Sequence, residues 1–171
     1  MRTLNPRRLT KLLERAIRLC GLQEQFAAST PPSPALNFVF VSVHKIRQIN
    51  TAFLNCRNRT DVIAFDLRPN RETGQSQFPD NEPPAEEDDD VLGEIYVCPV
   101  VAARVARQYQ TAPEDELILY LVHGLLHLAG YRDHTPQQQR RMREAEERVM
   151  NKLRKEFSPA SIISLEYHLN P

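Results

Sequence analysis

The chain has 171 residues, 41% of them hydrophobic and 26% charged, and its formal net charge is zero. This length suits a single domain over residues 1–171, and the composition excludes a chain that is disordered throughout. The three cysteines are too few and too far apart for a disulfide framework or a paired-cysteine zinc site, and zero net charge excludes a global attraction to nucleic acid.

No apolar run approaches the roughly 18 residues that a membrane-spanning helix needs. The opening MRTLNPRRLTKLL lacks the apolar stretch of a signal peptide. We therefore expect a cytoplasmic protein without a membrane partner.

The first half of the chain predicts two helices, two strands and a loop. Asn5 and Pro6 are typical of a helix start, and apolar residues then recur at helical spacing until Gly21. Further predictions are a strand over 36–43, a short helix around Ile46 to Phe53, a strand over 61–67, and an exposed, mobile acidic loop at about 68–90.

The second half predicts one more strand and three helices. The strand covers 91–98, and Pro99 begins a helix that continues through Tyr109. The next helix runs from Pro113 to Gly130 and is apolar on nearly every face, which indicates a central buried helix. The last helix begins at Thr135. We see no internal repeat, and we expect an α+β fold.

The most informative segment is His123-Gly-Leu-Leu-His127, on the predicted central helix. Residues four apart lie one turn above each other, so both imidazoles can reach one metal ion. Gly130 then ends the helix, and the returning chain offers a third ligand, His134 or alternatively Asp133. Three protein ligands leave the fourth zinc position for water, as in catalytic sites.

The alternative is that His123 and His127 are hydrogen-bonded core histidines. Each buried ring without a partner costs roughly 1 to 3 kcal/mol, and this helix has few other polar residues. A shared metal ion satisfies both rings, so the spacing favours a metal site. The protease pattern HExxH has a glutamate after its first histidine, where this chain has Gly124, so a zinc peptidase is disfavoured.

With these residues in view, the chain resembles the YbeY family of zinc-dependent endoribonucleases. The resemblance rests on HGLLHLAGY at 123–131, TDVIAF at 60–65 and LGEIYVC at 92–98, and it covers about residues 36–155. It implies a small mixed sheet packed against helices, with one Zn²⁺ per chain at the end of the central helix. His123 and His127 match the first two zinc ligands of the family.

The chain departs from the family pattern at three places. The family's third histidine falls six residues after the second, where this chain has Asp133, and His134 follows. Leu54 replaces a family arginine that is suspected of assisting phosphate chemistry, and Arg57 and Arg59 are possible substitutes. Arg59 and Asp66 replace prolines that flank TDVIAF.

The resemblance also implies a function in the cytoplasm. It predicts cleavage of single-stranded RNA, including the 3′ end of small-subunit ribosomal RNA, with ribosomes or small-subunit proteins as partners and no DNA. One rival is a non-catalytic assembly factor that zinc stabilises. The other is a zinc peptidase, an alternative that Gly124 disfavours.

The charges are unevenly distributed along the chain. The stretch 80–90 is strongly acidic, and Glu14 is the single acid of the first helix region. For each run alone a solvated surface is the usual interpretation. If the protein binds RNA, the basic helix is the predicted contact. Its cations are Arg2, Arg7, Arg8, Lys11, Arg15 and Arg18.

Overall fold

The computed structural model describes residues 2–27, 35–54, 60–68 and 91–165. The predicted acidic loop and the candidate arginines Arg57 and Arg59 lie outside these ranges. That residues 1–171 form one domain stays a prediction.

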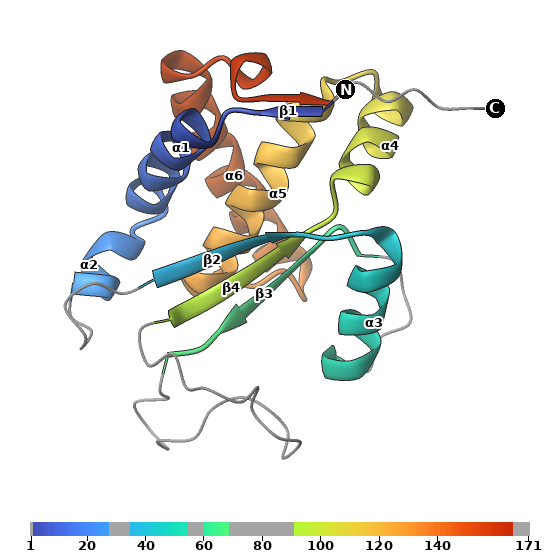
Figure 1. Ribbon diagram of the computed structural model, residues 1–171. Helices are drawn as coiled ribbons and strands as arrows, with labels where there is room; N and C mark the ends of the chain where they lie inside the picture. Colours follow the sequence, from blue (N-terminus) through green and yellow to red (C-terminus); the bar gives the residue numbers. More distant parts are fainter. Residues whose placement is uncertain (1, 28–34, 55–59, 69–90, 166–171) are drawn as a thin grey trace.

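The main sheet of the fold is mixed and has three strands (Figure 1). Its strand order is β2-β4-β3, with β2 (Ala35–Phe40) parallel to β4 (Val91–Val97) and β3 (Val62–Asp66) antiparallel to β4. A separate pair joins the ends of the described chain, where β1 (Arg2–Leu4) pairs antiparallel with β5 (Ile163–Leu165). The predicted α+β class with a small mixed sheet is confirmed.

Helices cover the sheet unequally. Figure 1 shows α3 on one side and the other helices gathered on the other side, with α5 against the strands. The bounds are α1 Pro6–Leu19, α2 Leu22–Ala27, α3 Val43–Leu54, α4 Pro99–Tyr109, α5 Pro113–Leu128, α6 Pro136–Glu156 and the short 3-10 helix η1 Pro159–Ser161.

Helix α5 is the central element, as its composition predicts. Leu121, Val122, Leu125 and Leu126 are fully buried in the main core, because strands, α1, α4 and α6 surround the helix. Among the described residues, no helix is both long and apolar enough to cross a membrane.

Two glycines let α5 lie close to the sheet. A Cβ on Gly124 would come within 2.8 Å of Ile95 Cγ2, and one on Gly93 would lie 3.0 Å from the Phe65 carbonyl oxygen and 3.1 Å from Leu128 Cδ1. Both contacts are at or below the limit of ordinary packing. The absence of side chains at these two positions therefore sets the distance between α5 and β4.

The structure corrects one boundary and adds short elements. The predicted strand over 36–43 ends at Phe40, and α3 begins at Val43, because the Ser42 hydroxyl accepts a hydrogen bond from the Lys45 amide and the Ser42 carbonyl accepts one from Ile46. The sequence analysis did not predict α2, β1, η1 or β5. The other predicted elements agree with the structure to within a few residues.

Candidate metal centre

The imidazole rings of the two histidines of α5 converge at their Nε2 atoms. His123 and His127 lie on successive turns, their Nε2 atoms are 2.9 Å apart, and their rings stand at 85° to each other. Their side chains are 24% and 29% exposed, so the place between them is accessible from outside the core. The predicted convergence of the two imidazoles is present in the structure.

The chain then folds back and brings a carboxylate to the same place. Helix α5 ends at Leu128, and Gly130 has a φ of +94°, a left-handed conformation that suits glycine. Asp133 Oδ2 lies 3.9 Å from His123 Nε2 and 4.0 Å from His127 Nε2. All three ligand atoms lie within 4.8 Å of one another, so this group could hold a metal ion.

The sequence analysis named His134 as the third ligand and Asp133 as the alternative, whereas the structure places Asp133 with the two histidines. His134 is exposed, whereas Asp133 is half-buried at the metal group. Among the described residues, the group that could hold a metal ion thus contains Asp133 and not His134.

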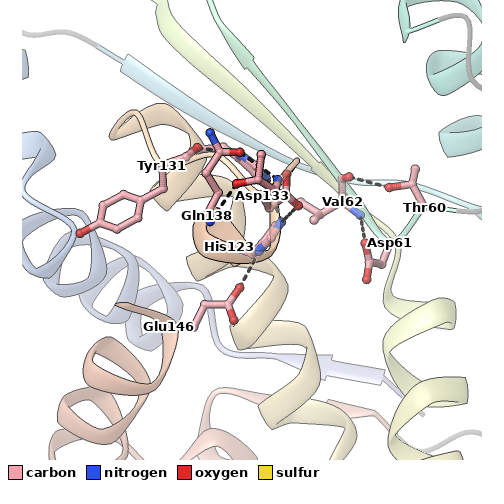
Figure 2. Close-up of polar contacts among 10 residues, drawn as sticks. Thr60, Asp61, Val62, His123, Tyr131, Asp133, Gln138 and Glu146 are labelled. Carbon is pink, nitrogen blue, oxygen red and sulfur yellow. Dashed lines mark hydrogen bonds and ion pairs between the residues drawn. The ribbon is translucent and has the colours of Figure 1, made fainter. Parts of the chain in front are cut away.

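Each histidine uses its other ring nitrogen to contact an acceptor. His123 Nδ1 lies 2.6 Å from Glu146 Oε1 of α6 (Figure 2). His127 Nδ1 lies 3.1 Å from the Tyr131 carbonyl oxygen. A carbonyl oxygen can only accept, and an ionised carboxylate also only accepts, so both Nδ1 atoms carry the proton. Such contacts are typical of the outer partners that orient metal-binding histidines.

These tautomers leave an unusual contact at the centre of the group. With both Nδ1 atoms protonated, neutral rings present two Nε2 lone pairs to each other across 2.9 Å, beside the Asp133 carboxylate. Two acceptors at this distance repel each other unless a cation lies with them. The arrangement therefore fits a metal ion, or in its absence an extra proton on one ring.

The surroundings act on the two rings in opposite directions. Burial by itself lowers the pKa of His123, but the hydrogen bond and charge of Glu146, with the charges of Asp61 and Asp133, outweigh burial and raise that pKa. Burial lowers the pKa of His127, and the neighbouring His123 lowers it further. An extra proton would therefore be held on His123.

The sequence analysis missed two acidic residues near the site. Glu146 is one, and its signal was an acid at the edge of the core stripe of α6, next to the buried Ala145. Asp61 is the other, and it lies at the start of β3 near His123 (Figure 2). Its side chain accepts from the Val62 amide, and burial together with the charge and hydrogen bond of Asp61 raises the pKa of Tyr120.

The predicted phosphate-binding residues cannot be placed from the described chain. Arg57 and Arg59 lie outside it, and Leu54 is the last residue of α3, with its side chain also outside the description. Thr60 is the first described residue after this gap, and Asp61, which follows it, lies near His123.

A scan against protein-family models matches the model described as endoribonuclease YbeY over residues 2–154. This chain belongs to the YbeY family. The match covers most of the chain and all but the last residue of the predicted range of about 36–155, so the predicted resemblance is confirmed.

Two proteins named endoribonuclease YbeY agree with this assignment. An endoribonuclease YbeY of Protochlamydia amoebophila is 36% identical over 120 residues, which are 70% of this chain and 71% of that protein. One from Thermotoga maritima is 35% identical over 99 residues, 58% of this chain and 53% of that protein. The chain thus spans about half the length of the Thermotoga relatives that it matches. A Thermotoga maritima protein solved in solution is 27% identical over 86% of this chain and 87% of its own, with a TM-score of 0.44.

Proposed function

We propose that this protein is a zinc-dependent endoribonuclease of single-stranded RNA that acts in the cytoplasm during ribosome biogenesis. Its proposed substrate is ribosomal RNA, including the 3′ end of the small-subunit RNA, and its partners are ribosomes or small-subunit proteins. The family assignment supports the endoribonuclease class. The paired Nε2 atoms of His123 and His127 carry the metal part of the proposal.

The donor set fits zinc. Two imidazole nitrogens and one carboxylate oxygen are ligands that zinc prefers, and three protein ligands leave a position for water or substrate. We assign these ligands to His123, His127 and Asp133. When bound, zinc supplies Lewis acidity, which polarises a phosphoryl oxygen and makes water more acidic.

The chain's own groups prepare the site for this chemistry. Glu146 and the Tyr131 carbonyl hold the two rings in the tautomer that exposes both Nε2 lone pairs. We assign phosphate binding to Arg57 and Arg59. Arg59 lies two residues before Asp61, within about 7 Å of fully extended chain, and Asp61 lies near His123.

The alternative that this protein is a zinc peptidase has little support. In that class a glutamate follows the first histidine, and here any side chain at Gly124 would collide with Ile95. The base that a peptidase needs therefore cannot come from this position of α5.

The proposal is tested with metal analysis and an RNA cleavage assay. We expect one zinc per chain, cleavage of labelled single-stranded RNA, loss of cleavage with a chelator, and recovery when zinc is restored. His127→Ala should abolish cleavage, whereas His44→Ala, which changes an exposed histidine of α3, should not. Circular dichroism checks that both variants are folded.

Three outcomes would contradict the proposal. Cleavage that survives both the chelator and His127→Ala excludes a zinc mechanism. RNA binding by the zinc-loaded wild type without any cleavage favours the assembly factor, whose zinc only completes the core. Hydrolysis of peptides instead of RNA favours the peptidase.

A further inference from the structure

Helices α1 and α6 pack against each other along a seam that carries positive charge. The two helices are in contact, and Figure 1 shows them side by side on the same side of the sheet. Arg15 of α1 binds Glu156 of α6 through both carboxylate oxygens, at 2.8 to 3.0 Å. This ion pair marks which side of each helix faces the seam.

Helical spacing places further cations on the same side. Arg8, Lys11 and Arg18 lie seven and four residues before Arg15 and three residues after it, which are positions of one helix face. All three are exposed. The acid of this helix, Glu14, lies three residues after Lys11 and four before Arg18, so it borders the same face and offsets one of these charges.

Helix α6 contributes two cations in the same way. Lys152 and Arg148 lie four and eight residues before Glu156, on one row of the helix, and both are exposed. We call Arg8, Lys11, Arg18, Arg148 and Lys152 the basic seam. Glu156 is neutralised by Arg15, and the five cations outnumber the two acids at neighbouring positions, Glu14 and Glu144, so the seam keeps a net positive charge.

The two helices run in opposite directions, so the seam leads toward the metal group. Arg15 contacts Glu156, and the charge of Arg148 opposes the effect of burial, which raises the pKa of the Cys20 thiol to about 12. Residue numbers therefore rise along α1 while they fall along α6. Arg148 also donates a hydrogen bond of 3.4 Å to the Tyr131 hydroxyl.

Tyr131 connects the end of the seam with the site. Its carbonyl oxygen contacts His127 Nδ1, while its ring points away from the metal group (Figure 2). A single residue, Tyr131, thus connects Arg148 with His127, a candidate metal ligand. From Arg8 to Arg18 the seam extends for about 15 Å along α1, a length that suits several phosphates of an extended strand.

We propose that the basic seam binds the sugar-phosphate backbone of single-stranded RNA on one side of the cleavage site and so directs the strand to the metal group. The inference rests on the proposed function, because it names how the same substrate is held. Lysines and arginines that neutralise phosphates release counterions, so binding should depend steeply on salt. Such contacts carry no base preference.

The test measures binding of a 2′-O-methylated oligouridylate by fluorescence anisotropy over a range of salt concentrations, with gel electrophoresis to verify that the oligomer stays intact. The variant combines Arg18→Gln, Arg148→Gln and Lys152→Gln. We expect the slope of log affinity against log salt to become shallower by roughly two, since each phosphate contact on a single strand contributes about 0.7. Affinity at low salt should fall roughly ten-fold or more.

The matched control combines Lys45→Gln, Arg104→Gln and Arg107→Gln. These exposed residues of α3 and α4 lie on other faces, and their replacement changes the net charge equally. The control should bind like the wild type. Equal slopes for the two triple variants, or a wild type that does not bind the oligomer, would overturn the inference.

The two proposals can fail separately. If the seam variant binds weakly but the wild type never cleaves unmodified RNA, RNA binding by the basic seam is supported and the endoribonuclease proposal fails. If the wild type cleaves RNA while the seam and control variants bind alike, the enzyme stands and the seam is excluded.

Discussion

At the scale of single residues, the site depends on how two imidazoles are oriented. His123 and His127 each face an acceptor with Nδ1, and this leaves their Nε2 atoms facing each other. The acceptor of His123 is the carboxylate of Glu146, which is 16% exposed. A largely buried carboxylate behind a metal-binding histidine makes the ring a better ligand.

Replacing Glu146 should therefore weaken metal binding. We expect Glu146→Ala to reduce zinc affinity by about 10- to 100-fold, the range typical of such outer partners, and Glu146→Gln to have a smaller effect because its amide oxygen can still accept. Competition with a chromophoric chelator measures the change. Glu147→Ala, at an exposed position of the same helix, is the control, and equal affinities for the two alanine variants would contradict the orienting role.

The third ligand is also decided by single residues. Asp133→Ala should weaken zinc binding by more than the roughly 10- to 100-fold expected of an outer partner, because a direct ligand is lost. His134→Ala should leave the affinity unchanged, since His134 is exposed. Zinc titration of both variants checks this, and the reverse order of effects would assign the ligand to His134.

At the scale of elements, the C-terminal end of α5 is held by a residue from the end of β3. Arg68 binds both carboxylate oxygens of Asp66, and its Nη2 donates a 2.7 Å hydrogen bond to the Leu128 carbonyl oxygen. The last carbonyls of a helix have no partner within it, so an arginine is well suited to cap them. Leu128 directly follows His127, so this contact anchors the helix next to the site.

We expect Arg68→Ala to lower the free energy of unfolding by about 1 to 2 kcal/mol, a value reduced for partial exposure of the side chain. Arg68→Lys should recover part of the loss, because it keeps the charge but not the bidentate geometry. Urea unfolding followed by circular dichroism measures both variants. An unfolding free energy unchanged in Arg68→Ala would show that the cap contributes nothing.

A second prediction at this scale concerns the packing of α5 on β4. At an exposed helix position, Gly→Ala stabilises by about 1 kcal/mol, but a Cβ at Gly124 would meet Ile95 Cγ2 at 2.8 Å. We expect Gly124→Ala to destabilise the protein by roughly 1 to 3 kcal/mol through overpacking. Combining it with Ile95→Ala should cost less than the sum of the two single changes, as urea unfolding can show. A stabilised Gly124→Ala variant would mean that the helix can move away.

At the scale of the whole molecule, the metal group joins separate parts of the fold. Two of the candidate ligands lie on α5, the third on the segment after it, and Glu146, which contacts His123, on α6. An ion bound only by the folded chain stabilises it by mass action, by about 2.7 kcal/mol at a hundred times its dissociation constant. Removing the metal should therefore lower the melting temperature.

Thermal unfolding with zinc and with a chelator measures this coupling. The wild type should melt at a higher temperature with zinc, whereas His127→Ala should respond little. His44→Ala should respond like the wild type, since its exposed histidine lies on α3, outside the metal group. A wild type that melts at the same temperature in both conditions would exclude a metal bound to the folded state.

The sequence by itself determined the features that depend on near neighbours. The four-residue spacing of His123 and His127, the all-round apolar character of their helix and the start of α1 at Asn5 all follow from helical periodicity and local hydrogen bonding. The family resemblance rested on similarly local motifs. These predictions agree with the structure because the chain within a turn or two is enough to decide them.

Only the tertiary structure decided the contacts between distant segments. Glu146 meets His123 from 23 residues away, and Arg15 meets Glu156 from 141 residues away. That Asp133 rather than His134 lies with the two histidines depends on how the chain turns at Gly130 after α5. Periodicity states which side of a helix is apolar, but the partner on that side is set by packing of the whole chain, which no local pattern contains.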